Sequence, residues 1–153
     1  MAQYEIDSLD RKILSRLVED SRTPFLELAR DLKVSGGTIH GRVNKLREQG
    51  IVEGSQMMLN YQKLGYGLSA FIGVKVRLTR EVSYVKDKLA EFSEITEIYY
   101  TTGNFSLMVK AVVKDMAHFH MFLSEKLQSI DPVQSTETFM VLSCHLKRER
   151  VLD

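Results

Sequence analysis

The hydrophobic pattern of this chain changes its period near residue 60, and no other feature of the sequence constrains the fold as strongly. Before that point the apolar residues recur every three to four positions, as on one face of an α-helix. After it, segments that alternate like β-strands are interspersed with helical ones. A length of 153 residues suits one ordinary domain or two small ones. We therefore predict an α+β chain with two domains, residues 1–60 and 61–153.

The first domain begins with two segments of helical period. Residues 6–20 carry the first apolar stripe, with Asp7 as the candidate N-cap. Residues 22–34 carry the second stripe. Here Thr23 is the candidate N-cap, and a proline occupies the first helical position, where its missing N–H costs nothing.

A third helix follows after the short turn of residues 33–35. Ser35 is its candidate N-cap, and it ends at Gly50, in the place of a C-cap glycine. Residues 51–60 then have the pattern of a short strand or small hairpin. The order helix, helix, tight turn, helix and β-wing predicts a winged helix-turn-helix, in which the helix after the turn enters the major groove of DNA.

This third helix combines an apolar stripe with three glycines, each about 1 kcal/mol worse than alanine in a helix. Ile39, Val43 and Leu46 form the stripe on a helical wheel, and the opposite face is bare at its N-terminal end and then polar and basic. A bare face at the positive end of the helix dipole can lie close to a phosphate backbone or deep in a groove. The candidate DNA-binding residues are Ser35, Gly36, Gly37, Thr38, His40, Gly41, Arg42, Asn44, Lys45 and Arg47.

The alternative is a helix of poor propensity that tertiary packing holds in place, and the glycines alone favour neither explanation. The local charge favours DNA, because residues 30–50 contain five lysines and arginines against two acids. The whole chain has a net charge of only +1, so any basic surface must be local. Arg42, Lys45 and Arg47 are the candidates for contacts with phosphates or base edges.

The second domain has the order strand, helix, strand, strand, helix, strand, which is that of the split βαβ, or ferredoxin-like, motif. Gly103 and Asn104 form a two-residue hairpin signal between the second and third strands. Such a sheet leaves one face uncovered, and its apolar residues predict burial against another copy of the chain. The expected elements are residues 68–78, 81–94, 95–102, 105–113, 115–130 and 133–146.

Three stretches together resemble the Lrp/AsnC (feast/famine) family of transcription regulators: "IDSLDRKIL", "ELARDLKVSGGTIHGRVNKLREQGIV" and "YYTTGNFSLMV". The resemblance covers essentially the whole chain, and "YYTTG" with the later "QSTET" is most similar to the AsnC branch, whose members respond to asparagine. It implies a sequence-specific DNA-binding regulator with a winged helix-turn-helix and a ferredoxin-like ligand-binding domain. It also implies dimers that assemble into octamers, and amino-acid effectors that bind between dimers and change the assembly or the DNA binding.

The segment from Tyr99 to Ser106 is the candidate effector site. Its turn would expose backbone N–H groups, which can bind a small anion such as an α-carboxylate. On the residues alone an ordinary hairpin is the better explanation, since Thr and Tyr favour strands anyway, and it is the resemblance that favours an effector. Asp131, Glu137 and the hairpin carbonyls are candidate acceptors for an ammonium group. The candidate ligand-binding residues are Tyr100, Thr101, Thr102, Gly103, Asn104, Ser106, Gln128, Gln134, Ser135, Thr136 and Glu137.

The rest of the sequence limits the function classes. No apolar run approaches the roughly 20 residues that span a bilayer, and the N-terminus has acids where a signal peptide has an apolar segment. With a single cysteine, we expect a cytoplasmic protein with no membrane partner. The usual catalytic, metal-binding and nucleotide-binding motifs are missing, so we expect neither an enzyme nor a cofactor. Two rivals are a small enzyme on a ferredoxin-like scaffold and an interaction module that has lost DNA binding.

Overall fold

The structure is a computed structural model that describes residues 4–149, and it divides into two compact units. The first unit holds the residues up to Met58 together with the described residues from Leu146 onward, and the second holds Leu59–His145. The change from one unit to the other falls where the hydrophobic period changes. That the two units correspond to the domains 1–60 and 61–153 stays a prediction.

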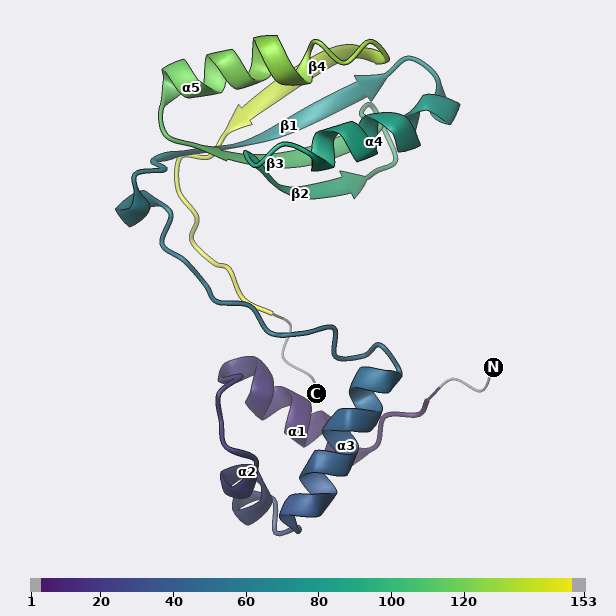
Figure 1. Ribbon diagram of the computed structural model, residues 1–153, viewed down its shortest axis with the longest axis vertical. Coiled ribbons are helices and arrows are strands. Elements are labelled where there is room, and N and C mark those ends of the chain that lie inside the picture. Colours follow the sequence, from purple (N-terminus) through teal and green to yellow (C-terminus); the bar gives the residue numbers. More distant parts are fainter. Residues whose placement is uncertain (1–3, 150–153) are drawn as a thin grey trace. The chain divides into compact units, whose positions relative to one another are not determined.

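The first unit is built from α1 (Ser8–Glu19), α2 (Phe25–Asp31) and α3 (Gly36–Glu48), as Figure 1 shows. The three predicted helices are thus confirmed. An apolar stripe of each helix contributes to a common core, and the predicted stripe of α3 is buried. The buried residues of this core are Ile13, Leu28, Ala29, Ile39 and Val43.

Side-chain caps fix where α1 and α3 begin. Asp7 accepts hydrogen bonds from the backbone N–H groups of Leu9 and Asp10, each at 2.9 Å, which confirms it as the N-cap of α1. The Ser35 hydroxyl accepts from the Thr38 N–H at 3.0 Å, which confirms it as the N-cap of α3. Both helices therefore begin where the sequence predicts.

The predicted N-cap of α2 is wrong by one residue. The helix begins at Phe25 with Pro24 in the cap position, so Thr23 lies outside it. The Thr23 hydroxyl donates instead to the carbonyl of Asp20 at 2.8 Å, in the turn that follows α1. Because that turn already uses the hydroxyl, it does not cap α2.

The turn between α2 and α3 closes through a left-handed residue. Lys33 has a φ of 56°, and the N–H of the next residue donates to the Ala29 carbonyl at 2.9 Å, a pattern that ends many helices. The same pattern ends α3, where Gly50 has a φ of 67° and the next N–H donates to the Leu46 carbonyl at 2.9 Å. The predicted tight turn and the C-terminal glycine are confirmed.

The predicted strand or hairpin of the wing is not formed by residues 51–60, which are neither helix nor strand. Nearly all of them are exposed, including Met57 and Met58. A strand requires hydrogen bonds to a neighbouring strand, and the sheet in the described part of the chain takes its strands from residues 68–140. The wing prediction fails because alternation alone does not supply a partner strand.

The second unit is an antiparallel sheet with the strand order β2-β3-β1-β4 and two helices (Figure 1). The order of elements along the chain is βαββαβ, so the predicted ferredoxin-like fold is confirmed. Short 3₁₀ turns lie at Gln62–Leu64 and Thr79–Glu81. The longer elements are β1 (Leu68–Val76), α4 (Val82–Ala90), β2 (Ile95–Tyr100), β3 (Leu107–Val113), α5 (Met116–Met121) with a π-helical continuation (Phe122–Leu127), and β4 (Val133–Met140).

The two faces of the sheet differ. On one face, alternate residues of the strands pack with both helices in a core that includes Ile72, Val85 and Phe122. The intervening residues point to the other face, where Phe71 and Phe139 remain 36% and 45% exposed. In the single chain this second face is therefore partly apolar and open.

The last strand is shorter than predicted, since it ends at Met140 rather than at residue 146. Met140 pairs with Ala70, close to the beginning of β1 at Leu68. The Val141 N–H still donates to the Ser69 carbonyl at 2.9 Å, and because β1 begins at Leu68 it offers a partner for one or two residues beyond Met140 but not as far as residue 146.

A buried carboxylate connects the loop after α4 to α5. Glu94 is 6% exposed, and its Oε1 accepts from the Lys126 Nζ at 2.6 Å and lies 3.3 Å from the His118 Nε2. Burial raises the pKa of Glu94, but these hydrogen bonds and the charge of Lys126 outweigh that effect and hold the pKa below its ordinary value. The carboxylate is therefore ionised at neutral pH and pairs with Lys126.

Candidate DNA-binding face and effector site

Most of the predicted DNA-binding residues lie on the exposed side of α3. The stripe that packs into the core lies on the other side, so the helix is amphipathic as predicted. Contact of this side with DNA stays a prediction. The exposed members of the set are Ser35, Gly37, His40, Gly41, Asn44, Lys45 and Arg47, and the half-buried ones are Gly36, Thr38 and Arg42.

The glycines of α3 differ in what surrounds them. A Cβ added to Gly36 would lie 3.2 Å from Cδ2 of Leu26, so packing favours a small residue there. A Cβ on Gly37 would meet Ser35 Oγ at 3.8 Å, and one on Gly41 would meet nothing within 4 Å. Gly41 therefore costs the helix about 1 kcal/mol relative to alanine, and packing within residues 4–149 does not explain its presence.

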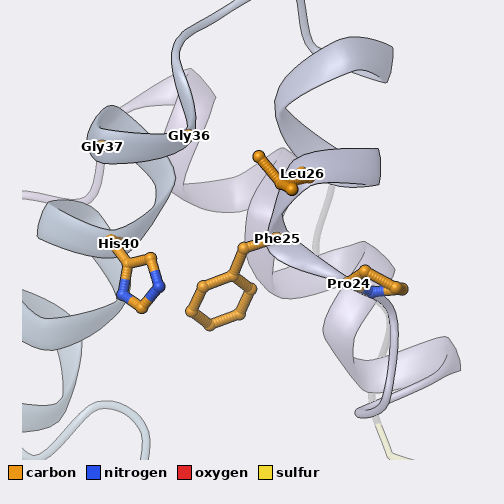
Figure 2. A pocket seen from close by; sticks show the side chains of 6 residues that line it. All are labelled: Pro24, Phe25, Leu26, Gly36, Gly37 and His40. Atoms are coloured by element: carbon orange, nitrogen blue, oxygen red, sulfur yellow. The ribbon is translucent and has the colours of Figure 1, made fainter.

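An open hollow of about 590 Å³ lies between the first turns of α2 and α3, as Figure 2 shows. The edge of the His40 imidazole and the Phe25 ring meet there, with centroids 4.7 Å apart and an interplanar angle of 81°. His40, a predicted DNA-binding residue, is thus oriented by an aromatic contact while it stays exposed. The lining residues are Pro24, Phe25, Leu26, Gly36, Gly37 and His40.

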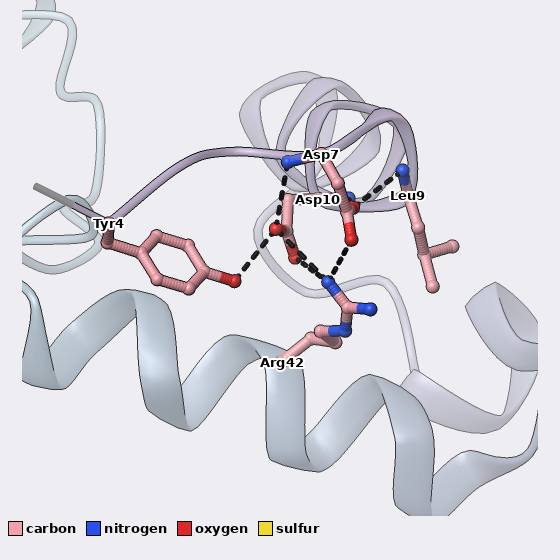
Figure 3. Close-up of polar contacts among 5 residues, drawn as sticks. All are labelled: Tyr4, Asp7, Leu9, Asp10 and Arg42. Carbon is pink, nitrogen blue, oxygen red and sulfur yellow. Dashed lines mark hydrogen bonds and ion pairs between the residues drawn. The ribbon is translucent and has the colours of Figure 1, made fainter.

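A second buried carboxylate lies in the first turn of α1 and faces α3. Asp10 is 0% exposed, and its Oδ2 accepts the Tyr4 hydroxyl at 2.8 Å and the Asp7 N–H at 3.2 Å. The Arg42 Nη1 lies 3.2 Å from both oxygens of Asp10 and forms a further ion pair with Asp7. Figure 3 shows the guanidinium of α3 directed at the two carboxylates of α1.

This arrangement gives Arg42 partners other than the predicted ones. The sequence places it among the cations that contact DNA, yet the guanidinium is directed at α1 and the side chain is 33% exposed. Asp7 and Asp10 are 35 and 32 positions away in the sequence, so a helical wheel could not reveal them as partners. The sequence did contain a signal for the arrangement of the two acids. Asp10 follows the N-cap Asp7 by three residues, which is the spacing of a capping box, and the structure contains that box.

The groups of this cluster shift one another's pKa. The hydrogen bond to Asp7 and the charge of Asp10 raise the pKa of Arg42, against the effect of desolvation. The N–H of Asp10 and the guanidinium of Arg42 hold the pKa of Asp7 below its ordinary value. The hydrogen bond to Asp10 raises the pKa of Tyr4. At neutral pH the cluster therefore holds Arg42 and Asp7 charged and Tyr4 as the neutral phenol.

The connection between β2 and β3 spans residues 101–106 and is longer than the predicted two-residue hairpin. It closes with a hydrogen bond from the Thr101 N–H to the Ser106 carbonyl at 3.1 Å. Gly103 has the predicted positive φ, at 105°, whereas Asn104 is not in the left-handed region. The predicted hairpin is confirmed, since β2 and β3 pair antiparallel, but its predicted loop of two residues is too short. The Ser106 N–H donates to β1 instead of extending the ladder between β2 and β3.

The tip of this connection presents backbone donors to the surroundings. Thr102, Gly103 and Asn104 are exposed, and their N–H groups donate to no other residue between 4 and 149. A Cβ added to Gly103 would meet nothing within 4 Å, so the tip is open to approach. Such donors suit a small anionic group.

Two of the predicted effector segments lie at the same end of the sheet, on either side of β1. On one side of β1 the Ser106 N–H donates to the Val74 carbonyl at 2.9 Å, and on the other side Val74 pairs with Thr136 of β4. Because neighbouring strands are about 4.8 Å apart, Ser106 and Thr136 lie roughly 10 Å from each other. The Gln128 amide donates to the Thr136 hydroxyl at 2.8 Å and so belongs to the same place.

The two candidate acidic acceptors are placed differently. Asp131 pairs with Arg77 at 2.9 Å and is therefore already engaged. Glu137 is exposed and stands opposite Gly73 in the register of β1 and β4. Of the two, Glu137 is thus the better placed to accept from a ligand. The other exposed members of the predicted set include Tyr100, Gln134 and Ser135.

Sequence analysis did not single out Gly73 and Phe105. The Phe105 ring lies so close to β1 that a Cβ on Gly73 would be 2.6 Å from the ring carbons. The same ring packs edge to face against Phe139, with centroids 6.5 Å apart. A glycine inside a largely apolar strand is a sequence signal of such a close approach. The contact anchors the connection 101–106 to the sheet.

Two classes of site are not represented in what the structure describes. No group of three or more metal-binding side chains occurs among residues 4–149. Within the same range, every helix is too short or too polar to cross a membrane.

Family models match both units of the chain. An AsnC-type helix-turn-helix domain matches residues 6–47, and an Lrp/AsnC ligand binding domain matches residues 69–151. Regulatory protein AsnC of Haemophilus influenzae is 42% identical over 146 residues, which are 95% of this chain and 97% of that protein. Regulatory protein AsnC of Escherichia coli K12 is 39% identical over 148 residues, which are 97% of each.

Solved structures agree with these matches. The structure of E. coli AsnC has a TM-score of 0.90 and 38% identity, and the match covers 96% of this chain and 99% of that one. A transcriptional regulator from Neisseria meningitidis in complex with L-methionine has a TM-score of 0.88 and 27% identity over 97% of both chains. Together with the helix-turn-helix, these likenesses define a DNA-binding transcriptional regulator. The chain belongs to the Lrp/AsnC family.

Proposed function

We propose that this regulator responds to a free amino acid, with asparagine as the first candidate. The amino acid binds at the end of the second-unit sheet, where residues 101–106 meet the start of β4. The observation that supports this proposal is that two predicted segments flank Val74 of β1, with Ser106 on one side and Thr136 on the other. The Neisseria relative, in complex with L-methionine, supports an amino acid as the effector class. The choice of asparagine depends on the resemblance to the AsnC branch.

The two charged groups of an amino acid need partners of opposite kind. The exposed N–H groups of residues 102–104 suit the α-carboxylate, and Glu137 suits the ammonium group. The side-chain amide of asparagine needs both a donor and an acceptor. Gln128 and Gln134 carry both functions and lie beside or within β4.

We further propose that the exposed side of α3 is the DNA-binding face, with Lys45 and Arg47 as phosphate contacts. Support comes from Gly41, an exposed helical glycine that packing inside the chain does not explain. In a dimer, two such helices would enter successive major grooves of a roughly palindromic site, about one helical turn apart. The cytoplasm, where this DNA is found, is the proposed location.

The effector response is proposed to act through assembly. The partly apolar open face of the sheet, with Phe71 and Phe139, suits association with a second copy of the chain. Dimers and, through them, octamers are the forms that the family resemblance implies. An amino acid changes the balance between assemblies only by its different affinity for each of them.

A thermal-shift screen of the full chain against the common amino acids tests this proposal. A ligand at one hundred times its Kd adds about 2.7 kcal/mol of stability, which raises the unfolding temperature measurably. Light scattering and DNA titration with asparagine, glutamine, methionine and leucine then show whether the ligand changes assembly or affinity. A protein that none of the common amino acids stabilises would contradict the proposal.

A further inference from the structure

Arg42 belongs to the proposed recognition helix but is directed away from its exposed face. The Nη1 lies 3.2 Å from both oxygens of Asp10 and also pairs with Asp7. Asp10 is 0% exposed, so its hydrogen-bond partners are these protein groups rather than bulk water. If the guanidinium moved to a phosphate, the buried carboxylate would keep the Tyr4 hydroxyl and the Asp7 N–H as its hydrogen-bond donors among residues 4–149.

The same carboxylate is connected to the exposed face of α3 through Tyr4. The Tyr4 hydroxyl donates to Asp10 at 2.8 Å, and its ring centroid lies 4.8 Å from the Lys45 Nζ. Figure 3 shows Tyr4 and Arg42 both directed at Asp10. The buried Asp10 of α1 thus contacts Arg42 directly. Through Tyr4 it is also linked to Lys45, which lies one turn after Arg42 in α3.

We propose that Arg42 is a positioning residue of the recognition helix. Together with Asp10 it fixes the position of α3 against α1. The position of α3 in turn sets the register in which its exposed face meets the base pairs. Arg42 itself makes no contact with DNA. This inference rests on the proposed assignment of α3 as the recognition helix. It reverses the role that the sequence predicts for one of the three cations of this helix.

Salt dependence separates a positioning residue from a residue that binds phosphate. When a substitution removes one cation that binds a phosphate, the slope of log affinity against log salt becomes shallower by about 0.9. A displaced helix, by contrast, loses discrimination between base sequences, because base-edge contacts carry the sequence information. The two measurements therefore report on different roles of the same side chain.

The experiment uses the full chain with Asp10→Asn and Arg42→Gln combined. This pair removes the ion pair, leaves the net charge unchanged and keeps hydrogen-bonding groups at both positions. Circular dichroism and thermal unfolding define the temperature range in which the variant is folded, and all binding is measured within it. The wild type selects a preferred duplex from a random library, and affinities for that duplex and for a random one are measured at several salt concentrations. Arg47→Gln is the matched control, since it removes an exposed cation of the same helix.

For the double variant we expect an unchanged salt slope and a loss of discrimination of about fivefold or more, the smallest loss typical of one mismatched base pair. For Arg47→Gln we expect a slope shallower by about one for each bound subunit. A slope that becomes equally shallow in the double variant overturns the proposal, because Arg42 is then a phosphate contact. Unchanged slope and unchanged discrimination also overturn it, because the ion pair then serves stability alone. If neither the double variant nor Arg47→Gln alters DNA binding, α3 is not the recognition helix. The proposed DNA-binding face and the proposed role of Arg42 are then both wrong.

Discussion

α3 in the first unit and β1 in the second each contain a glycine inside a regular element, and the two glycines have different surroundings. Gly73 of β1 lies against the Phe105 ring, where an added Cβ would be 2.6 Å from ring carbons. Gly41 of α3 is exposed, and an added Cβ would meet nothing within 4 Å. Packing inside the chain explains the first glycine and leaves the second unexplained. A glycine that the fold does not need is therefore the better indication of an outside partner.

The cations of α3 show the same contrast between internal and external roles. Arg42 is engaged with two carboxylates of α1, whereas Lys45 and Arg47 are exposed. The three look alike in the sequence, and the structure separates one from the other two. The proposal therefore assigns the contacts with DNA phosphates to the exposed pair.

The largest expected effect comes from Gly103→Val in the connection between β2 and β3. Its φ of 105° strains a β-branched side chain, and the added bulk would cover the exposed N–H groups. We expect a complete loss of the amino-acid response with DNA binding retained. Calorimetry with asparagine, glutamine and leucine measures the response, and circular dichroism on the same samples verifies the fold.

Gly65→Val is the matched control for that substitution. Gly65 also has a positive φ, at 87°, and nothing lies within 4 Å of an added Cβ. It lies in the turn before β1, outside the connection 101–106 that carries the candidate effector site. It should cause comparable strain without loss of the response. A Gly103→Val protein that still binds the effector as tightly as the wild type would place the site elsewhere.

The next effect concerns the glycine that packing explains. We expect Gly73→Ala to lower the free energy of unfolding of the second unit by about 1–3 kcal/mol, the usual cost of overpacking. Urea unfolding measures it. Adding Phe105→Leu should recover part of the loss because it removes the ring that the new methyl meets. A Gly73→Ala protein as stable as the wild type would show that the ring moves aside at no cost.

Lys45→Ala sharpens the distinction among the cations. The side chain is exposed and its contact is with the Tyr4 ring, so its removal leaves no cavity in the core. We expect the fold to persist and the salt slope of DNA binding to become shallower by about one for each bound subunit. Electrophoretic titration at several salt concentrations measures this. Unchanged affinity and slope would remove Lys45 from the contact set.

A smaller effect is expected from acid. The Asp10 N–H and Arg42 lower the pKa of Asp7 in the fold, so its contribution to stability is fully present above the ordinary carboxyl pKa of about 3.9. That contribution is lost as the pH falls through the lowered pKa. Between about pH 6 and about pH 2 we expect Asp7→Asn to lose less stability than the wild type. Urea unfolding across this range checks it, and parallel curves for the two proteins would contradict the account.

Local features of this molecule could be predicted from the sequence, whereas distant partners could not. The stripe of α3, the cap at Ser35 and the left-handed Gly103 depend on residues close together in the chain, and all are present. The partners of Arg42 lie more than thirty positions away, as the separations of 35 and 32 show. The strand predicted for residues 51–60 fails for a related reason, since its existence depends on a neighbouring strand.

The candidate sites follow the same division. The resemblance to the family identifies the segments of the candidate effector site along the chain, and their role stays a prediction. Their placement on either side of Val74 depends on the sheet order, in which β1 lies between β3 and β4. The contact between Gly73 and Phe105 joins β1 to the connection between β2 and β3, and periodicity within β1 does not reveal it.

The most direct test of the comparison is Gly41→Ala, with unfolding and DNA binding measured on the same preparation. Alanine is the better helix former, and its methyl group meets nothing in the chain within 4 Å, so the first unit should gain up to about 1 kcal/mol of stability. If the bare face of α3 lies against DNA, the same methyl group should weaken binding to the selected duplex. The account therefore predicts a more stable protein that binds DNA less tightly. A variant that is more stable and binds with unchanged affinity would contradict it.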